Sequence, residues 1–397
     1  MRRRYIGLLY LISCGLYWMG VSLTMGMAVP FLSFHGFNNT QMGLILSGAN
    51  VACIVISLSL ASLADRGGAK AILPVLISGL LAAAVSLAAL IFVSLPGPLF
   101  CAAYILLAAS VLAVGPLYIK LYHDLERTCP LPAFGLFRAF GSLCFAGMSF
   151  LSGTMLRRSP VAVIPVINIL CVLPQLLCLT ALYPVLSRAK TGTALKAAGR
   201  ADYLSILSGR KSFVMLLAGI FLIFLVHNNV SSFKANILKE LNADVSSVAF
   251  LNGATVLSEF PAMLLYGRFG KKAPGKWLAL SLVFFLVKIV FITAAGSVGM
   301  LYAAFMLQSV SFGLYSPAIV DHIKACFPYE QTGRAQSLAA NIPVAGSVIG
   351  ALVVGMLLDH RPLRIALTAL SVLTALGVAT ALAALKAGQK EKNRPSS

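Results

Sequence analysis

Residues 63–70 read Leu63-Ala64-Asp65-Arg66-Gly67-Gly68-Ala69-Lys70, a short charged loop between two long apolar segments. Paired glycines let a chain turn within a few residues, and basic residues mark the side of a bilayer on which a loop lies. About half a chain later the loop has a weaker copy, Tyr266-Gly267-Arg268-Phe269-Gly270-Lys271-Lys272. The repeat predicts two homologous bundles of membrane helices.

The composition places the chain in lipid. Of its 397 residues 59% are hydrophobic and only 11% are charged, and the mean hydropathy is +0.92. Polar side chains are therefore too few to cover a soluble globule of this length. Apolar stretches, each near the roughly 20 residues that a helix needs to cross the hydrocarbon, occupy 5–34, 40–64, 71–95, 98–122, 133–156, 160–186, 212–234, 245–266, 277–296, 298–323, 335–358 and 363–385. We expect an all-α membrane protein with twelve transmembrane helices in two pseudo-symmetric six-helix bundles.

The basic residues give the expected orientation. Most of the 31 lysines and arginines lie at the N-terminus, in alternate loops and in the C-terminal tail. The opposite side has Arg157, Arg158, Lys234, Lys239, Arg361 and Arg364. By the positive-inside rule both termini are cytoplasmic, and we expect the inner (plasma) membrane of a bacterial-type cell. The net charge of +20 is mostly this bias, so we expect no nucleic-acid partner.

One long polar interruption divides the chain. We expect an N-terminal bundle over 1–186, a cytoplasmic linker over 187–211, a C-terminal bundle over 212–386 and a cytoplasmic tail over 387–397. A linker of this kind lets two six-helix halves move against each other, as alternating access requires. The other loops are too short for a further domain, so the chemistry must lie inside the membrane.

The charged loop resembles the loop between helices 2 and 3 of the major facilitator superfamily, usually written G-x-L-A-D-R-x-G-R-K. Leu63, Ala64, Asp65, Arg66, Gly68 and Lys70 match that motif, whereas Ala61 replaces its first glycine and Ala69 its first basic residue. The resemblance implies a transporter in which this loop controls the conformational change. The conformational residues would be Asp65, Arg66, Gly68 and Lys70, with Arg268 in the second copy.

Over nearly its whole length the sequence also resembles the lactose-permease and phenylpropionate-permease branch of that superfamily. Phe134-Gly135, Arg138 and Phe140-Gly141 are similar to the fifth helix of the branch. The resemblance places Arg138 at the substrate-binding arginine and Phe145 at the tryptophan on which a galactoside stacks. It places Lys120 at the sugar-binding glutamate, which argues against galactosides.

Other positions depart from the branch as well. The coupling histidine and glutamate of the lactose permease fall at Gln308 and Ser311, and the aspartates of its seventh helix fall at Asn228 and Ser231. Most of the charged residues that form the network of the lactose permease are thus replaced by uncharged residues in this sequence. The proton route of the lactose permease therefore cannot simply be transferred to this chain.

Charges at bilayer depth cost at least about 2.5–3.5 kcal/mol, so each needs a partner, a water-filled cavity or a function. Glu259 and Lys288 are read either as a buried ion pair or as a proton-coupling site. Arg138 and Lys120 are read either as substrate ligands or as cations that snorkel to the interface. His227 can titrate near neutral pH, or it can be a hydrogen-bonded core residue. Asp321 is read either as a coupling group or as an inner gate residue that pairs with loop cations.

We therefore expect a secondary active transporter that takes up a small organic solute, with an organic anion or carboxylate favoured, by proton-coupled alternating access. The alternatives are a neutral sugar or nucleoside symporter, or a drug or metabolite exporter. A membrane scaffold or enzyme is the remote alternative, since no catalytic cluster is visible. The expected substrate-binding residues are Arg138, Lys120, Phe145, His227, Asn228, Asn252 and Gln308, and the expected proton-coupling residues are Glu259, Lys288 and Asp321.

The expected partners are the substrate, protons or another ion, and membrane lipids. We expect a monomer without a cofactor or a metal site. Since no Gly-x-x-x-x-Gly-Lys-Ser/Thr loop occurs, the energy source must be a gradient.

Overall fold

The computed structural model describes residues 2–66, 71–126, 131, 134–186, 206–207 and 210–392. Gly68, Lys70 and most of the expected linker 187–211 lie outside the described residues. Asp65 and Arg66 end a helix, and their side chains are likewise outside what is described. All the regular structure within the described ranges is helical.

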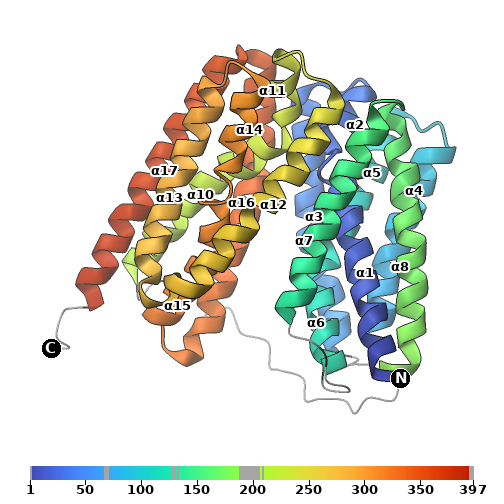
Figure 1. The fold of residues 1–397 in the computed structure, drawn as a ribbon, viewed down its shortest axis with the longest axis horizontal. Coiled ribbons are helices and arrows are strands. Elements are labelled where there is room, and N and C mark those ends of the chain that lie inside the picture. The colour runs from blue at the N-terminus through green and yellow to red at the C-terminus, as the bar shows by residue number, and fades with distance from the viewer. Residues whose placement is uncertain are drawn as a thin grey trace. The chain divides into compact units, whose positions relative to one another are not determined.

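The helices run in chain order through two compact units (Figure 1). The first part of the chain forms α1 (Arg2–Thr24), α2 (Ala28–Phe34), α3 (Asn39–Arg66), α4 (Ile72–Phe92), α5 (Gly97–Ala113), α6 (Gly115–Glu126), α7 (Phe134–Leu156), the 3₁₀ turn η2 (Val161–Val163) and α8 (Ile164–Leu186). The second part forms α10 (Lys211–Ser232), α11 (Lys234–Glu240), α12 (Val245–Phe269), η3 (Gly270–Lys272), α13 (Pro274–Ala294), α14 (Val298–Met306), α15 (Phe312–Cys326), α16 (Tyr329–His360) and α17 (Leu363–Lys392).

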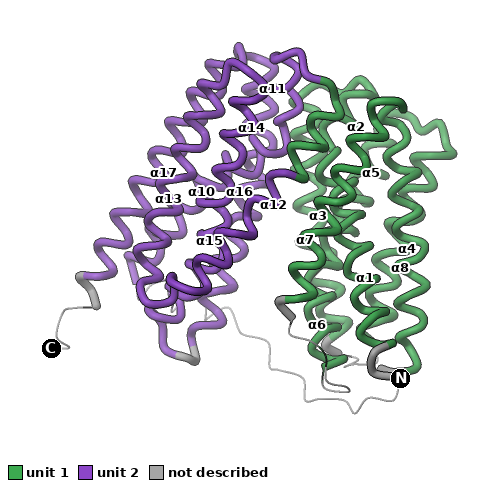
Figure 2. The backbone as a smooth tube through the Cα atoms, in the orientation of Figure 1, with its two compact units in different colours: residues 1–195, 244–253 green, residues 196–243, 254–397 purple. Residues whose placement is uncertain are grey.

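The two units of Figure 2 follow the halves of the sequence with one exchange. Unit 1 contains Met1–Leu195 and also Asp244–Gly253, which is the start of α12. Unit 2 contains Lys196–Ala243 and Ala254–Ser397. Within unit 1 the Phe250 ring contacts the Phe150 ring at 6.2 Å, and the Arg157 guanidinium lies 4.9 Å from the Phe250 centroid. The beginning of α12 is therefore packed with the first unit.

Twelve membrane-crossing segments are confirmed. Eleven described helices or helix pairs are long and apolar enough to cross a membrane on their own. The remaining expected span, 298–323, is formed by α14 and α15 together, each too short to qualify alone. Large apolar side chains such as Phe92 and Leu177 are exposed, at 80% and 69%, as a surface that faces lipid requires.

In each half the first and the fourth span are broken. The breaks fall at residues 25–27 between α1 and α2, at Val114 between α5 and α6, at Phe233 between α10 and α11, and at 307–311 between α14 and α15. Pro30 and Pro116 account for two of them, because a proline ring clashes with the carbonyl four residues earlier and lacks an N–H. The same two breaks occur in both units, as expected for two pseudo-symmetric halves.

Close helix packing positions α10 in unit 2. Its neighbours α16 and α17 approach it at glycines: a Cβ on Gly346 would lie 2.9 Å from the Leu225 nitrogen, and one on Gly377 would lie 2.9 Å from the Gly219 oxygen. Small residues of this kind let helix backbones come together in a membrane. The polar side chains of α10 are thereby held at fixed positions in the unit.

Candidate functional site

A chain of three polar side chains crosses the interior of unit 2. The Lys288 ammonium donates a hydrogen bond to Gln308 Oε1 at 2.5 Å, and Gln308 Nε2 donates to Glu259 Oε1 at 3.0 Å. Lys288 and Gln308 are buried, whereas Glu259 is half-buried. The sequence predicted either an ion pair or a proton-coupling site at Glu259 and Lys288. In the structure Gln308 connects the two side chains.

Three elements hold this chain in place. Glu259 lies on α12, Lys288 on α13, and Gln308 in the break between α14 and α15. Turn hydrogen bonds fix the break, because Gln308 N donates to Phe305 O at 3.0 Å and Gly313 N donates to Gln308 O at 3.0 Å. The break in the membrane helix thus presents the Gln308 side-chain amide to both neighbours. The amide accepts a hydrogen bond from Lys288 and donates one to Glu259.

Lys234 is a functional candidate that sequence reasoning missed. It begins α11 directly after the break at Phe233, and its side chain is 5% exposed. Its ammonium lies 5.5 Å from the centroid of the Phe305 ring, and that of Lys288 lies 4.8 Å from the same centroid. The sequence placed Lys234 among outer charges, because it stands at the end of an apolar stretch. The sequence offered no signal for its burial, because the break before α11 was not predicted.

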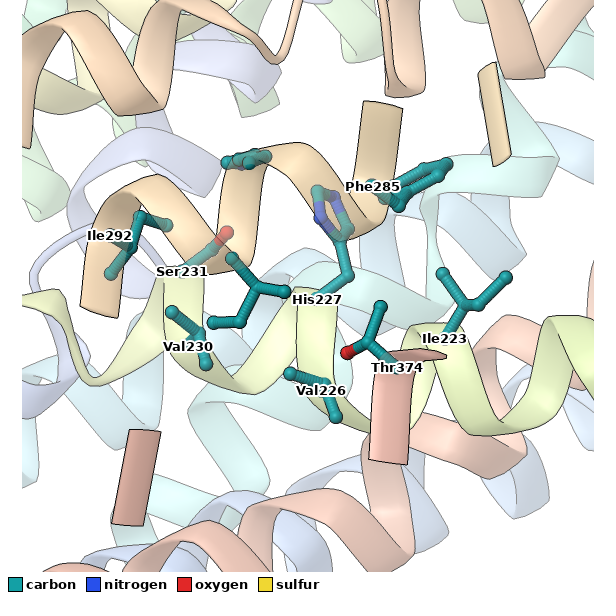
Figure 3. A pocket seen from close by; sticks show the side chains of 10 residues that line it. Ile223, Val226, His227, Val230, Ser231, Phe285, Ile292 and Thr374 are labelled. Atoms are coloured by element: carbon teal, nitrogen blue, oxygen red, sulfur yellow. The ribbon is translucent and has the colours of Figure 1, made fainter. Parts of the chain in front are cut away.

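His227 lies in an aromatic cluster on α10. Its ring stacks on Phe312 with 6.0 Å between centroids and meets Phe285 edge-on at 4.7 Å. A small pocket beside it is lined by His227, Ser231, Lys288, Thr374 and apolar side chains, and its volume is about 10 Å³. Figure 3 shows the His227 ring and the Ser231 hydroxyl on the same side of α10. Several polar side chains therefore line a pocket whose other lining residues are apolar.

Two asparagines expected in the substrate site make internal contacts. Asn228 Nδ2 donates to Ser347 Oγ at 2.6 Å and connects α10 to α16. Asn252 Nδ2 donates to the Gly26 carbonyl at 2.8 Å, within unit 1 and at the break of the first span. Neither asparagine has a recorded contact with the chain of Lys288, Gln308 and Glu259.

In unit 1 the Arg138 side chain is supported by Trp18. The Arg138 Cζ lies 4.3 Å from the centroid of the Trp18 ring, and Arg138 Nη1 donates to Ser142 Oγ at 2.8 Å. Sequence reasoning did not identify Trp18. In the structure, Gly141 leaves room on α7 for the indole. Phe145 is half-buried and packs against the core of this unit.

The remaining candidates lie in other surroundings. Lys120 is half-buried on α6. Asp321 accepts a hydrogen bond from the Tyr266 hydroxyl at 3.1 Å and pairs with Lys324 at 3.7 Å. Arg268 is exposed, and its guanidinium lies 5.5 Å from the centroid of the adjacent Phe269 ring. Asp321 thus joins α12 to α15 with partners different from those of Glu259.

Among the buried polar side chains of unit 2, several are basic or hydrogen-bond donors. Lys234, Lys288 and His227 are buried, and the charges of both lysines act on His227. Glu259 is the carboxylate that reaches this cluster, through Gln308. No group of three or more His, Cys, Asp or Glu side chains suited to a metal ion occurs in the described ranges. The arrangement is suited to binding anions and to moving a proton.

Comparison with known proteins gives the family. The model of the MFS_1 like family matches residues 11–369. Over 145 residues the chain is 28% identical to an uncharacterized MFS-type transporter of Mycobacterium tuberculosis. That match covers 36% of this chain and 25% of the relative, so the likeness extends over a quarter of the relative's length.

Solved structures have the same fold. The nucleoside transporter NupG superposes with a TM-score of 0.75 at 14% identity, covering 98% of this chain and 99% of that one. A POT family transporter in complex with 5-aminolevulinic acid gives a TM-score of 0.74 at 12% identity, with 98% and 96% coverage. A bacterial homolog of the human lysosomal transporter Spinster gives 0.72 at 13%, covering 99% of both chains. At such identities the likeness shows the fold alone.

Proposed function

The chain belongs to the MFS_1 like family, and on that premise we propose that this membrane transporter is a secondary active carrier that couples a small organic anion to protons by alternating access. The observation that carries the proposal is the chain from Lys288 through Gln308 to Glu259. Ionisable side chains inside a membrane bundle are expensive and usually mark substrate or proton pathways. Interrupted helices, such as the one that contains Gln308, often form substrate and ion sites in transporters.

The hydrogen-bonded chain suggests how a proton and an anion would be coupled. Unprotonated Glu259 is the counter-charge of Lys288, relayed by the Gln308 amide. When Glu259 takes up a proton, that counter-charge disappears, and an anion becomes the better partner for the Lys288 ammonium. Proton and anion then bind cooperatively, because each lowers the cost of the other. A loaded carrier of this kind moves no net charge for a monovalent anion.

The preference for an anion rests on the excess of cations. The cations concerned are Arg138 in unit 1 and the buried Lys234 and Lys288 in unit 2, whereas Lys120 has the buried carboxylate Asp124 one turn later on α6. The planar guanidinium of an arginine can bind a carboxylate through two parallel N–H donors, which makes Arg138 a suitable partner for an organic anion. His227 and Gln308 remain proposed substrate ligands, while Phe145 would contribute apolar contact.

A neutral solute is the second candidate. The aromatic cluster of Phe285, Phe312 and His227 offers stacking surface, and Asn228 and Gln308 offer amides. A sugar or nucleoside can use such groups, and one structure of the same fold belongs to a nucleoside transporter. A drug or metabolite exporter would use the same aromatic surface in the opposite direction.

The wider biology follows from the same proposal. We place the protein in the inner (plasma) membrane with both termini in the cytoplasm, working as a monomer among lipids. Protons, or another ion, would supply the driving force. Catalysis is not part of this function, since transporters of this kind move their solutes unchanged.

Uptake into proteoliposomes tests the proposal. A proton gradient directed into the vesicles is imposed on the reconstituted protein. Labelled lactate, succinate, benzoate, glucose or adenosine is then added outside. We expect gradient-driven accumulation of at least one carboxylate and of neither neutral solute. Glu259→Gln should still bind and exchange that carboxylate but fail to accumulate it, because the site can no longer gain and lose a proton.

The matched control is Glu240→Gln, which removes an exposed carboxylate on α11. It should accumulate substrate as the wild type does. Accumulation of glucose or adenosine alone would replace the anion proposal with the second candidate. Normal accumulation by Glu259→Gln would remove Glu259 from the coupling step and leave Lys288 or Asp321.

A further inference from the structure

A second cavity, much larger than the pocket beside His227, lies at one end of unit 2. It is lined by the first turns of α10 and α13 and by the last turns of α15 and α17, and its volume is about 530 Å³. Figure 1 shows these ends of α13, α15 and α17 on the same side of the unit as the C-terminus. Ligand pockets typically have volumes of about 300–1,000 Å³. None of the lining residues belongs to the proposed substrate or coupling site, so this cavity would bind a ligand of its own.

An arginine supplies a positive charge to the cavity. Arg210 is half-buried, its Cζ lies 4.4 Å from the centroid of the Phe327 ring, and its Nη1 donates a hydrogen bond to Cys326 O. The Phe327 ring is held in turn by Phe213, which meets it edge-on with 4.8 Å between centroids. A guanidinium has five N–H donors, and the described lining residues include no carboxylate. Arg210 is thus positioned to bind a phosphate oxygen.

Two helix N-termini add to this positive charge. α10 begins at Lys211 and α13 begins at Pro274, and Ser212 and Gly275 in their first turns line the cavity. Neither helix has a side-chain hydrogen bond at its N-cap. The first N–H groups of a helix carry a partial positive charge that favours an anion. The charge of Arg210 and the two helix ends therefore favour the same kind of ligand.

The wall of the cavity changes from polar to apolar along its helices. On α10 Ser212 lines the first turn, and Leu216 lines the cavity one turn further into the span. On α17 Gln389 lines the cavity near the helix end, and Leu385 lines it one turn further in. Leu216 and Leu385 are buried. This order matches a lipid, whose charged headgroup lies at the membrane surface and whose acyl chains lie deeper.

We propose that this cavity binds one anionic phospholipid, with phosphatidylglycerol as the simplest case. Its phosphate contacts Arg210 and the N-termini of α10 and α13, and the start of an acyl chain packs against Leu216 and Leu385. The orientation proposed above puts this end of the unit on the cytoplasmic side. Basic pockets between transmembrane helices on that side are typical sites for anionic lipid headgroups.

Two other ligands match the cavity less well. A soluble phosphate compound would leave the apolar wall at Leu216 and Leu385 in contact with water, which is unfavourable. A zwitterionic lipid would bring its own cation close to the Arg210 guanidinium. The lipid is a resident ligand that joins the ends of four helices, and it is not the transported solute. The proposal therefore stands or falls independently of the proposed transport function.

Native mass spectrometry of the purified full-length protein in detergent tests this site without any transported solute. Dioleoyl phosphatidylglycerol should be retained at about one molecule per monomer and bind at least about tenfold more tightly than dioleoyl phosphatidylcholine. The melting temperature should rise with phosphatidylglycerol and not with glycerol 3-phosphate, which has a phosphate but no acyl chain. Equal binding of the two lipids would overturn the anionic headgroup. An equal rise with glycerol 3-phosphate would indicate a soluble anion and overturn the lipid.

Variants locate the lipid. Arg210→Gln should weaken phosphatidylglycerol binding at least about tenfold, since a charge-assisted hydrogen bond is lost. Lys276→Gln is the matched control, because it removes an exposed charge from the first turn of α13 without touching the lining, and it should bind the lipid as the wild type does. Equal effects of these two variants would mean that the lipid is attracted only by overall charge and would overturn the site.

A steric variant keeps the test valid if Arg210→Gln fails to fold. A Cβ on Gly388 would lie 3.4 Å from Ser212 Oγ, an ordinary contact, so α17 can accept a side chain at this lining position. Gly388→Leu should narrow the cavity and weaken binding of phosphatidylglycerol while every charge remains. Wild-type affinity in Gly388→Leu would show that the lipid does not enter the cavity and would overturn the proposal.

Discussion

The Arg138 guanidinium stacks on the Trp18 indole, with 4.3 Å between Cζ and the ring centroid. The indole is itself seated on Gly141, because a Cβ there would collide with the Trp18 ring. We therefore predict that Gly141→Ala displaces Trp18 and weakens transport without touching Arg138 directly. The expected result is a higher KM with nearly unchanged protein yield, measured by uptake at several substrate concentrations.

Gly147→Ala is the matched control for this change. Gly147 lies on the same helix, and a Cβ at that position would meet nothing within 4 Å. It should transport like the wild type. Equal KM values for the two alanine variants would show that the Trp18 position does not matter for the substrate.

Arg138 itself should determine the charge preference of the ligand. Arg138→Ala should abolish binding of the transported carboxylate, and Arg138→Lys should rescue it poorly, because a compact ammonium cannot reproduce a forked guanidinium contact. Thermal shift with the carboxylate measures both. Full activity of Arg138→Ala would return this residue to the role of a cation that snorkels to the interface.

Gln308 should behave as the middle of a three-membered chain. Gln308→Leu leaves the Lys288 ammonium and the Glu259 carboxylate without their recorded shared partner, which we expect to cost about 1–3 kcal/mol of unfolding free energy. Adding Lys288→Met to Gln308→Leu should cost little more, because the pair acts as a unit. Denaturation in detergent gives the four free energies of the cycle.

Gln336→Leu is a suitable comparison for that cycle. The Gln336 amide makes one long hydrogen bond, 3.4 Å to Val320 O, and we expect a small effect. If the losses in unfolding free energy from Gln308→Leu and Lys288→Met simply add, the two contacts are independent and the three-membered chain does not act as a unit.

The contact of α10 with α16 should be sensitive to a single methyl group. A Cβ on Gly350 would collide with Leu225 O and with the Asn229 amide, which donates to that same carbonyl at 2.8 Å. We expect Gly350→Ala to lower stability by about 1–3 kcal/mol, the usual cost of overpacking. Gly333→Ala, on the same helix with open space around it, should leave the melting temperature unchanged. Similar melting temperatures for both variants would contradict close packing at Gly350.

Asp321 should affect the rate of transport rather than its coupling. The carboxylate holds α15 to α12 through the Tyr266 hydroxyl and pairs with Lys324. Asp321→Asn and Tyr266→Phe should therefore change the initial rate of uptake to a similar degree, while the final accumulation ratio at an imposed pH gradient stays as in the wild type. Loss of accumulation in Asp321→Asn alone would make Asp321 a proton-coupling group.

The sequence predicted the fold well, because a membrane span is defined by the length and hydrophobicity of a stretch of residues. Both can be counted in the sequence without knowing any contact. The breaks of the first and fourth spans were not predicted. Leu307 to Ser311 contains no proline or glycine that would indicate a break, and its turn hydrogen bonds exist only in the folded unit. The chain of Lys288, Gln308 and Glu259 was missed for the same reason, since it depends on how three helices pack.

The candidate site was inferred from residue types and not from contacts, and the roles of its residues stay predictions. Glu259, Lys288 and Gln308 were all named from the sequence, since charges and amides stand out in apolar stretches. Lys234 was taken for a loop charge, because a lysine at the end of an apolar run reads the same whether it is buried or exposed. Trp18 carried no signal in the sequence, as an aromatic residue in a membrane span ordinarily contacts lipid or neighbouring helices.

The division of the tenth span also affects how the protein enters its membrane. With 9 and 15 residues, α14 and α15 are about 14 Å and 22 Å long, and neither can cross a hydrocarbon layer of about 30 Å. The turn between them satisfies most of its backbone N–H groups with local hydrogen bonds, such as Ser311 N to Leu307 O at 2.9 Å, but it carries the polar Gln308 side chain, which lipid cannot satisfy. This segment can therefore settle only against helices already inserted, above all α13, whose Lys288 meets Gln308 in the turn. We therefore expect the tenth span to settle in the second half only after α13 is in place, because α13 supplies the Lys288 partner of Gln308.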